Sequence, residues 1–567
     1  MAYSSLASMH RAIAERLGPR IALRYKQWGL YHDLSWHAYR RQADRAAAGL
    51  VTLGVEQGDR VGLLAENRLE WLVADIAILS AGAVGLPMHA PLAPKQVEFQ
   101  LSHSGTRGVI VSSQSQADKV LASLDQLPSL EFIISFDPVH VNGRIRQLTW
   151  DALMQLGHRE RADASLEVQR REQATTRDDL ATLIYTSGTT GVPKGVMLSH
   201  GNLLSNAEGA LEATRIWPDD VLLSWLPYSH IYARTCDHYL TMLAESVVCL
   251  AENHETLMTN LAETQPTWMT AVPRFYEKVW AAVEGLPPEA HGPALRRMFG
   301  PRLRQLSSGG APLPRHVAAG FEAAGVPLLE GYGLTESSPV ISFNRLGHNK
   351  VGTVGQPIPG VEVRIDVDGE VLTKGPHVMM GYWHDPEATA AVIEGDWLRT
   401  GDVGQLDDDG YLSITDRKKD LIVTAGGKNV SPAEIERLLV SDPFIDQAVV
   451  IGDRRPCITA LIVPNLPALE AKLRDLGGSL DVADGLIQAE PVRAFLAERI
   501  DRVMQAVSQP ERVREFLLLA QPFSLADGEL TATLKIRRRY ILDKHKDLIE
   551  GLYKNHTLTD NESCDVI

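Results

Sequence analysis

The first half of the chain alternates between two spacings of its apolar residues. Residues 41–53 have the spacing of an amphipathic helix, whereas 60–64 and 108–111 are short apolar runs typical of strands. Such alternation predicts an α/β fold in which helices cover the sheets. A second region of the same kind runs from 180 to about 342.

The pattern changes after this second region. Residues 361–365 and 370–373 flank an Asp368-Gly369 turn and predict a hairpin, and more short strands follow around Leu412 and Ile422. Beyond Arg417 the order is strand, helix, strand pair and a long charged helical region, which predicts a separate small α+β domain. Within it, Ser431-Pro432-Ala433-Glu434 predicts a helix start with a capping box.

The most apolar stretch, 71–92, carries Asp75 and is broken by Gly82, Gly85, Pro87 and Pro91. It therefore predicts a buried helix and strand rather than a membrane span. Residues 1–20 have no continuous apolar core, which disfavours a secretory signal. We expect a cytoplasmic protein on these grounds.

Composition and charge argue against nucleic acid as a partner and against a zinc site. The 567 residues are 44% apolar and 22% charged, and 56 basic against 71 acidic residues give a net charge of −15. This balance opposes nucleic-acid binding, so a polyanionic ligand needs a local basic site. Four cysteines without CxxC spacing argue against a disulfide framework and a zinc site.

Candidate chemistry starts with a glycine-rich and hydroxyl-rich loop directly after the apolar run 180–184. Its glycines, hydroxyls and single lysine form a donor-rich loop suited to phosphate oxygens. The spacing differs from a Walker A loop, because Val-Pro-Lys194-Gly195 follows the central glycine. The loop residues are Thr186, Ser187, Gly188, Thr189, Thr190, Gly191, Lys194 and Gly195.

The segment 185–200 resembles the phosphate-loop signature of the adenylate-forming superfamily, which includes acyl-CoA synthetases, luciferases and peptide-synthetase adenylation domains. The other signatures of that superfamily follow in the same order between about 34 and 553. The resemblance implies that ATP is bound by the following residues: Thr186, Ser187, Gly188, Thr189, Thr190, Gly191, Lys194, Gly309, Gly310, Ala311, Tyr332, Gly333, Thr335, Asp402 and Arg417.

Three segments of the N-terminal region carry the resemblance further. Leu-Pro-Tyr-Ser-His230 is similar to the motif whose histidine lies beside the acyl pocket and is a candidate catalytic residue. Residues 308–312 and 330–336 resemble the adenine and phosphate segments, where glycines permit close backbone approach and Tyr332 offers a ring for stacking. By the same resemblance, Glu336 and Thr186 are catalytic residues that hold Mg²⁺, a role that suits oxygen ligands.

The last motifs lie further along the chain. Asp402 matches the family's ribose-binding aspartate, and in the segment 416–429 Arg417 matches a ribose contact and Lys419 the hinge. Gly426 and Gly427 would admit the pantetheine arm of coenzyme A. In 529–535 Lys535 is the catalytic lysine, although Ala532 stands where many relatives have proline.

The resemblance implies a large N-terminal domain, 1–416, of helix-covered sheets with a small β-barrel-like subdomain. A smaller mobile α+β C-terminal domain, 417–553, and a polar tail, 554–567, follow. ATP would activate a fatty acid as its adenylate with loss of pyrophosphate, and rotation about Lys419 would then admit coenzyme A. The motif variants are most similar to long-chain fatty acyl-CoA synthetases.

Three alternatives stay open at this point. A fatty acyl-AMP ligase would load a carrier protein, but the insertion typical of that group after 352–357 is not evident. An aryl-CoA ligase shares every nucleotide motif. A catalytically silent nucleotide-binding protein need not retain Glu336, Asp402, Arg417 and Lys535 together.

The sequence also leaves the assembly open: peripheral association with a membrane and a homodimer are both compatible with it. The terminal Cys564-Asp-Val-Ile matches a prenylation pattern in outline. An aspartate in the first aliphatic position of that pattern disfavours modification.

Overall fold

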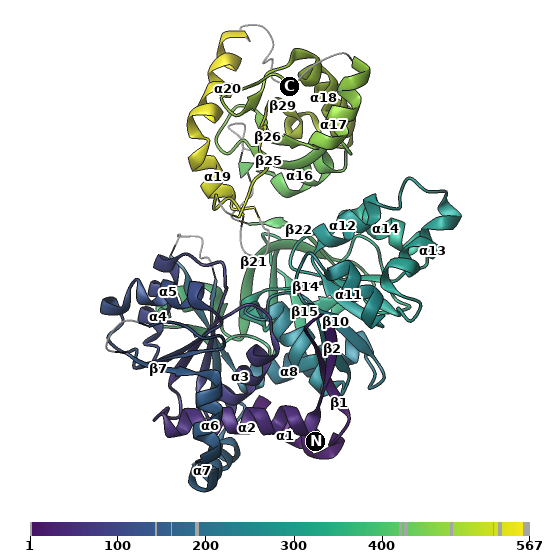
Figure 1. Cartoon of the computed structure of the whole chain (residues 1–567). Helices are drawn as coiled ribbons and strands as arrows, with labels where there is room; N and C mark the ends of the chain where they lie inside the picture. The colour runs from purple at the N-terminus through teal and green to yellow at the C-terminus, as the bar shows by residue number, and fades with distance from the viewer. Residues whose placement is uncertain are drawn as a thin grey trace. The chain divides into compact units, whose positions relative to one another are not determined.

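A computed structural model describes residues 3–141, 145–159, 161–186, 192–418, 422–423, 429–476, 480–525, 527–530 and 536–559. Among the predicted site residues, Ser187 to Gly191, Lys419, Gly426, Gly427 and Lys535 lie outside these ranges, as does Cys564. The chain divides into two compact units (Figure 1). Unit 1 comprises Met1–Asp366, Leu372–Thr400 and Leu406–Ser413, and unit 2 comprises Val367–Val371, Gly401–Gln405 and Ile414–Ile567.

One of the two large sheets of unit 1 has nine strands in the order β16-β15-β14-β13-β12-β10-β11-β1-β2. The neighbouring pairs from β1 through β11, β10, β12 and β13 to β14 are parallel. Fully buried runs such as Val-Leu-Leu-Ser in β10 suit strands that are covered on both faces. The bounds are β1 Ile21–Gln27, β2 Leu30–Ser35, β10 Val221–Ser224, β11 Val247–Leu250, β12 Trp268–Ala271, β13 Gln305–Ser308, β14 Leu328–Gly333, β15 Val340–Phe343 and β16 Gln356–Pro357.

Successive residues of these strands pack on opposite faces. Leu223 and Met269 join a cluster with helices on one side, whereas Leu222 and Trp268 belong to the core between the sheets. Figure 1 shows the covering helices beside the strands. They are α11 Leu257–Thr264, α12 Pro273–Ala281, α13 Pro288–Phe299 and α14 Arg315–Ala323.

The other large sheet has eight strands in the order β19-β9-β8-β4-β3-β5-β6-β7. The pairs from β8 through β4, β3, β5 and β6 to β7 are parallel, whereas β9 runs antiparallel to β8 and β19. The predicted strands at 60–64 and 108–111 are confirmed here. The bounds are β3 Arg60–Leu64, β4 Val84–Met88, β5 Gly108–Val111, β6 Phe132–Ser135, β7 Arg146–Thr149, β8 Leu180–Thr186, β9 Lys194–Ser199 and β19 Gly381–Tyr382.

Helix α3, Leu69–Ser80, is buried along nearly its whole length, and β4 follows it. The stretch predicted as a buried helix and strand is therefore confirmed. Helix α2, Trp36–Thr52, starts earlier than the predicted 41–53, because the Ser35 side chain accepts the Ala38 N–H and caps the helix there. The same core contains α1 Leu6–Leu17, α8 His200–Thr214, α9 Ile231–Ala233, the π-helical turn η2 Arg234–Tyr239 and α10 Leu240–Leu243.

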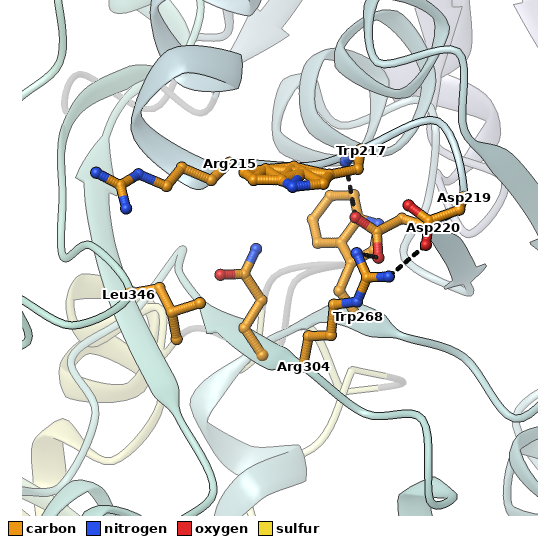
Figure 2. Close-up of a pocket in the computed structure, with 8 residues that line it drawn as sticks. Arg215, Trp217, Asp219, Asp220, Trp268, Arg304 and Leu346 are labelled. Atoms are coloured by element: carbon orange, nitrogen blue, oxygen red, sulfur yellow. Dashed lines mark hydrogen bonds and ion pairs between the residues drawn. The ribbon is translucent and has the colours of Figure 1, made fainter.

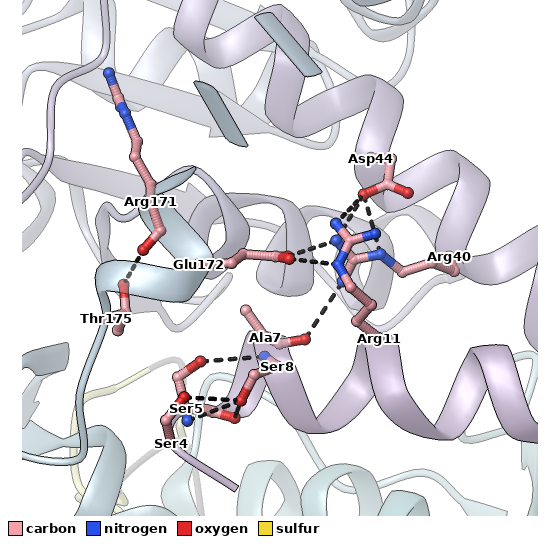
Figure 3. A network of polar contacts seen from close by, with 10 residues as sticks. All are labelled: Ser4, Ser5, Ala7, Ser8, Arg11, Arg40, Asp44, Arg171, Glu172 and Thr175. Carbon is pink, nitrogen blue, oxygen red and sulfur yellow. Dashed lines mark hydrogen bonds and ion pairs between the residues drawn. The ribbon is translucent and has the colours of Figure 1, made fainter. Parts of the chain in front are cut away.

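An ion-pair network joins α1 and α2 to helix α7, Arg161–Ala174 (Figure 3). Glu172, which is 4% exposed, accepts hydrogen bonds from Arg11 and Arg40. Asp44 accepts from the same two arginines, at 2.9 Å from Arg11 and 2.6 Å from Arg40. Because each buried charge has an opposite charge beside it, the desolvation of these groups is offset and the N-terminal helix is held in place.

Several peripheral elements complete unit 1. Three strands, β18, β21 and β22, have residues in both units. The helices are α4 Pro94–Ser104, α5 Gln114–Leu121, α6 Trp150–Arg159 and α15 Pro386–Val392, with 3-10 turns η1 Leu124–Gln126 and η3 Thr335–Ser337. The strands are β17 Glu362–Ile365, β18 Glu370–Lys374, β20 Ile393–Glu394, β21 Trp397–Leu406 and β22 Leu412–Arg417. Both predicted hairpin strands form, and the β-barrel-like arrangement stays a prediction.

Unit 2 is built on the three-stranded sheet β25-β26-β29, in which β25 and β26 are antiparallel and β26 and β29 parallel. Ser431 caps α16 by accepting the Glu434 N–H at 3.2 Å, as predicted. The described residues do not form the reciprocal bond that a capping box requires. The elements are β23 Ile422–Val423, β24 Asn429–Val430, α16 Pro432–Val440, β25 Ile445–Ile451, β26 Ile458–Pro464, α17 Leu466–Leu476, β27 Val482–Ala483, β28 Leu486–Ile487, α18 Glu490–Val503, η4 Met504–Ala506, η5 Gln509–Glu511, β29 Val513–Leu518, α19 Arg538–Lys544 and α20 Lys546–Thr559.

This is the mixed α/β architecture with a large N-terminal and a smaller C-terminal part that the sequence predicts. In the ranges that the structure describes, no helix is both long and apolar enough to cross a membrane.

Candidate active site

The predicted phosphate loop joins the ends of two paired strands. Thr186, the last residue of β8, lies opposite Lys194, the first residue of β9, in an antiparallel pair. Because the pairing continues back to Leu180 and Ser199, the two ends of the loop are fixed by a ladder of hydrogen bonds. The hairpin thus brings one predicted metal ligand and the predicted phosphate-binding lysine side by side.

A tyrosine that the sequence analysis missed connects this lysine to the predicted magnesium ligand. Tyr382 lies in β19, next to β9, and the Lys194 Nζ lies 4.9 Å from the centre of its ring. The Tyr382 hydroxyl donates a hydrogen bond to Glu336 Oε1 at 2.9 Å. Burial and the nearby Glu336 charge raise the pKa of Tyr382 well above its ordinary value, so the hydroxyl keeps its proton and remains a donor.

Glu336 lies in the 3-10 turn η3, which packs beside β9. Its backbone carbonyl accepts the Met379 N–H at 2.9 Å, so backbone and side chain are both anchored. Within the part of the chain that the structure describes, its Oε2 atom has no hydrogen bond or ion pair. A carboxylate with one unoccupied oxygen fits the preference of Mg²⁺ for a few protein oxygens together with phosphate and water.

The described residues contain no group of three His, Cys, Asp or Glu side chains that could hold a metal ion. With Glu336 and Thr186 as the predicted protein ligands, a magnesium ion here would take its remaining oxygens from the nucleotide and water. Thr335, which precedes Glu336, is buried.

The two glycines predicted to face adenine differ in their surroundings. They follow β13, where the chain leaves the carboxyl end of the sheet. Gly310 has a φ of +83°, and no atom lies within 4 Å of the position that a Cβ would take there, so the open face is available to a flat ligand. At Gly309 a Cβ would lie 3.0 Å from the Tyr232 ring. Ala311 follows directly in the same loop.

The packing around Gly333 explains why glycine is required at this position, which the motif alone did not reveal. A Cβ at this position would lie 1.8 Å from the Pro339 carbonyl oxygen, so any side chain would force β14 and β15 apart. The same hairpin holds Tyr332 opposite Ser342. Gly333 therefore has a packing role in this hairpin in addition to its predicted contact with ATP.

His230 has a neighbour that no sequence motif indicated. His230 precedes α9, and its Nδ1 accepts the Tyr232 N–H at 3.2 Å. His89 stacks against it with ring centres 6.2 Å apart, and His89 Nδ1 shares a 2.7 Å hydrogen bond with Ser229 Oγ. Burial lowers the pKa of His89 to about 4, so this imidazole is neutral near pH 7.

Asn67 fixes the segment that carries His230. Its side-chain nitrogen donates to the Leu226 carbonyl at 2.6 Å, and its oxygen accepts the Tyr228 N–H at 3.0 Å. His89 follows the carboxyl end of β4, the strand parallel to and beside β8, which ends at Thr186. The carboxyl ends of parallel strands meet at one edge, so His89 and the phosphate loop share that edge.

The two predicted ribose contacts lie together in unit 2. Arg417 Nε forms an ion pair with Asp402 Oδ1 at 3.0 Å, and the Asp402 side chain is 6% exposed whereas that of Arg417 is 59% exposed. The Lys418 N–H donates to the Gly401 carbonyl at 2.9 Å, which links the two segments through the backbone. The structure therefore brings this pair of residues together from two different strands, β21 and β22.

Comparisons with known proteins agree with these motifs. The family model described as AMP-binding enzyme matches residues 10–383, and that of the AMP-binding enzyme C-terminal domain matches residues 419–557. The chain is 33% identical to the long-chain-fatty-acid–CoA ligase FadD15 of Mycobacterium bovis, over 93% of each chain.

Two solved structures are similar over nearly their whole length. ATP-bound MatB from Rhodopseudomonas palustris has a TM-score of 0.74 and 26% identity, covering 96% of this chain and 99% of that one. The anthranilate CoA ligase AuaEII has a TM-score of 0.77 at 21% identity, covering 97% and 98%, a likeness of fold. The predicted α/β fold and the resemblance to the adenylate-forming superfamily are confirmed, and the chain belongs to the AMP-binding enzyme family.

Proposed function

We propose that this protein activates a fatty acid with ATP to the acyl-adenylate, releases pyrophosphate, and transfers the acyl group to coenzyme A. The observation that carries the nucleotide chemistry is the linked set Thr186, Lys194, Tyr382 and Glu336 at the end of the β8–β9 hairpin. The fatty-acid assignment is supported by the 33% identity to a long-chain-fatty-acid–CoA ligase over 93% of both chains.

In the first half-reaction an oxygen of the substrate carboxylate attacks the α-phosphorus, and the bond to pyrophosphate breaks. The carboxylate is already a nucleophile, so the enzyme needs no general base. Lys194 supplies positive charge to the phosphate oxygens, while Glu336 and Thr186 would hold Mg²⁺, which neutralises phosphate charge when bound. The remaining task is alignment of the acid with the α-phosphate.

Other described residues would orient the two substrates. Gly310 leaves an open backbone face for adenine, and Tyr332 would offer a ring for stacking. Asp402, with Arg417 beside it, would accept hydrogen bonds from the ribose hydroxyls. His89 and His230 would form a wall of the acid site, and the neutral His89 offers the acid a hydrogen-bonding group without a charge.

We further propose that the second half-reaction depends on residues of the C-terminal part. Lys535 would stabilise the first transition state, whereas Gly426 and Gly427 would admit the thiol arm of coenzyme A after a rotation about Lys419. The thiol sulfur then attacks the acyl carbon, and AMP leaves.

A fatty acyl-AMP ligase and an aryl-CoA ligase use the same nucleotide residues, so substrates must distinguish them. An aliphatic tail contributes about 0.8 kcal/mol for each buried methylene, which corresponds to about a fourfold change in kcat/KM. We expect kcat/KM to rise from butanoate to dodecanoate, with thioester formed when coenzyme A is present. Pyrophosphate exchange and thioester release across a panel of acids measure this. A preference for benzoate, or adenylate without thioester, would contradict the assignment.

Lys535 and Lys419 are expected to act at different moments of the cycle. Lys535→Ala removes one cationic donor from adenylate formation and should lower pyrophosphate exchange roughly 10²–10³-fold. Thioester formation from supplied acyl-adenylate should survive. Lys419→Pro fixes φ at the expected hinge and should leave exchange intact while abolishing thioester formation. Loss of both activities in each variant would contradict the two-step scheme.

Tyr382 should position Glu336 for the metal through its hydroxyl. Tyr382→Phe keeps the ring beneath Lys194 but removes the hydrogen bond to Glu336, so the Mg²⁺ concentration for half-maximal pyrophosphate exchange should rise about tenfold. Thioester formation from supplied acyl-adenylate should change little.

Tyr411→Phe is a matched control for this experiment. Tyr411 also carries a lysine over its ring, Lys350 at 5.2 Å, and its hydroxyl donates to a backbone carbonyl, that of His348, at 3.0 Å. The control should leave the Mg²⁺ dependence unchanged. If Tyr382→Phe behaves like Tyr411→Phe, Tyr382 does not position the metal ligand.

We also propose peripheral association with a bilayer, supported by the tip of the β1–β2 hairpin. Trp28 and Gly29 form its two-residue turn with φ of +55° and +76°, the combination of a type I′ turn. A tryptophan in this left-handed conformation is strained, and here it is 89% exposed, with Leu30 beyond it 68% exposed. Both side chains are mostly exposed and so contribute little packing to the fold, whereas indole partitions well into a membrane interface.

The hairpin tip can be tested with Trp28→Asn and Leu30→Asn. Asparagine tolerates left-handed φ, so Trp28→Asn should preserve or raise the thermal midpoint while lowering binding to phosphatidylcholine vesicles several-fold. Leu166→Asn is the matched control for Leu30→Asn, because Leu166 is 65% exposed. Co-sedimentation with vesicles measures binding. If both tip variants instead dissociate a dimer and leave vesicle binding intact, the tip joins two copies of the chain.

A further inference from the structure

A cavity lies at one edge of the nine-stranded sheet, opposite to the edge that carries the candidate active site. Its volume is about 380 Å³. Asp220 precedes β10, Trp268 begins β12 and Gln305 begins β13, so the cavity lies at the amino ends of three parallel strands. His230 and Gly310 follow the carboxyl ends of β10 and β13. The lining residues are Arg215, Trp217, Asp219, Asp220, Trp268, Arg304, Gln305 and Leu346.

The cavity has one flat aromatic wall. Figure 2 shows the Trp217 indole edge-on, with Leu346 and the Arg215 guanidinium toward one end and Arg304 with its two aspartates toward the other. Trp217 is 42% exposed, although most of the large apolar side chains in the fold are buried. An exposed indole face beside an aliphatic side chain favours a flat ring as the occupant.

The two arginines of the cavity differ in whether nearby carboxylates already neutralise their charge. Arg304 donates to Asp219 at 2.5 Å and forms an ion pair with Asp220 at 3.0 Å. The hydrogen bond from Arg304 lowers the pKa of Asp219. Because Arg304 already pairs with two aspartates, this end of the cavity has no uncompensated positive charge with which to attract an anion. The Arg215 side chain, in contrast, has no hydrogen bond or ion pair to any residue that the structure describes. It is therefore the group of this cavity that can bind an anion.

Two buried polar atoms of the lining also lack partners within the described ranges. Gln305 donates from Nε2 to the Thr214 carbonyl at 2.9 Å, but its Oε1 accepts no hydrogen bond. Trp268 Nε1 is likewise without an acceptor. Both residues are at most 3% exposed, and buried polar atoms in native proteins nearly always have a partner. An N–H donor on a bound ring would satisfy Gln305.

We propose that this cavity binds a small planar heteroaromatic carboxylate whose ring carries an N–H. The ring stacks on Trp217, its N–H donates to Gln305 Oε1, and its carboxylate pairs with Arg215. The volume lies near the lower end of the range for small-molecule sites, which suits one or two fused rings and excludes an acyl-CoA. This site is independent of the acid that the protein activates.

Calorimetric titration of the full chain with indole-3-carboxylate tests the proposal. The candidate active site is first saturated with dodecanoyl sulfamoyl-adenosine, so that the probe cannot occupy the acid site. We expect one equivalent to bind. Arg215→Gln and Trp217→Leu should each weaken binding about tenfold or more while leaving pyrophosphate exchange unchanged. Naphthalene-1-carboxylate, which lacks the N–H, and 3-methylindole, which lacks the carboxylate, should both bind more weakly.

Arg454→Gln is the matched control for Arg215→Gln. Both arginines are exposed and both have left-handed backbone, with φ of +56° at Arg454 and +53° at Arg215. The control should bind the probe as the unmodified chain does. No binding by the unmodified chain, binding that the adenylate analogue abolishes, or equal affinity in all the variants would each overturn the proposal.

Discussion

A buried ion pair joins Asp75 of α3 to Arg234 of η2, the turn whose polar side chains bond to both large sheets. Both side chains are at most 2% exposed. Burial alone would raise the pKa of Asp75, but the Arg234 charge and the hydrogen bonds from its neighbours lower it to about 2.

Arg234 also donates a hydrogen bond to Thr182 in β8. Three residues later, Asp237 accepts hydrogen bonds from Ser224 in β10 and Thr270 in β12. The π-helical turn η2 thus bonds to one sheet through its arginine and to the other through its aspartate. Removing either member of the ion pair would leave an uncompensated buried charge, a loss of about 3–5 kcal/mol.

This constraint explains why residues distant in sequence reach one site. Thr182 lies four positions before Thr186 on the same strand, so the hydrogen bond from Arg234 to Thr182 holds the strand that leads into the predicted phosphate loop. Arg234 lies four positions after His230 and its N–H donates to the His230 carbonyl, so it is also tied to the segment predicted to face the acid. Tyr382 then connects the hairpin to Glu336, and Asn67 connects the His230 segment to the loop after β3. The segments that carry Thr186, His230 and Glu336 are therefore held by buried and part-buried polar contacts, and accurate alignment of reactants requires such support.

The sequence was sufficient to predict the elements that follow from a local hydrophobic pattern and the candidate residues that lie in motifs. Strands β3 and β5 have the predicted bounds, and the buried stretch in 71–92 is a helix followed by a strand, because periodicity and glycine or proline breaks act locally. Tyr382 and His89 were missed because their roles depend on contacts across the fold: Tyr382 meets Glu336 over 46 positions, and His89 meets Ser229 over 140. The ion pair of Asp75 and Arg234 spans 159 positions. The motif identified Gly333, but only the structure gives the Pro339 carbonyl as the reason that no side chain fits there.

The parallel strands of the nine-stranded sheet also separate the candidate active site, at their carboxyl ends, from the cavity at their amino ends. Parallel α/β sheets place functional loops at the carboxyl ends of their strands, and the motifs of this chain follow that rule. At the amino ends of these strands, the left-handed Arg215 and the exposed Trp217 line a cavity. Gln305 and Trp268 have buried polar atoms without hydrogen-bond partners in the described part of the chain. Strand β13 begins with Gln305 at one edge and leads to Gly309 at the other, so a ligand at the amino edge would contact the strand that carries the predicted adenine-binding loop.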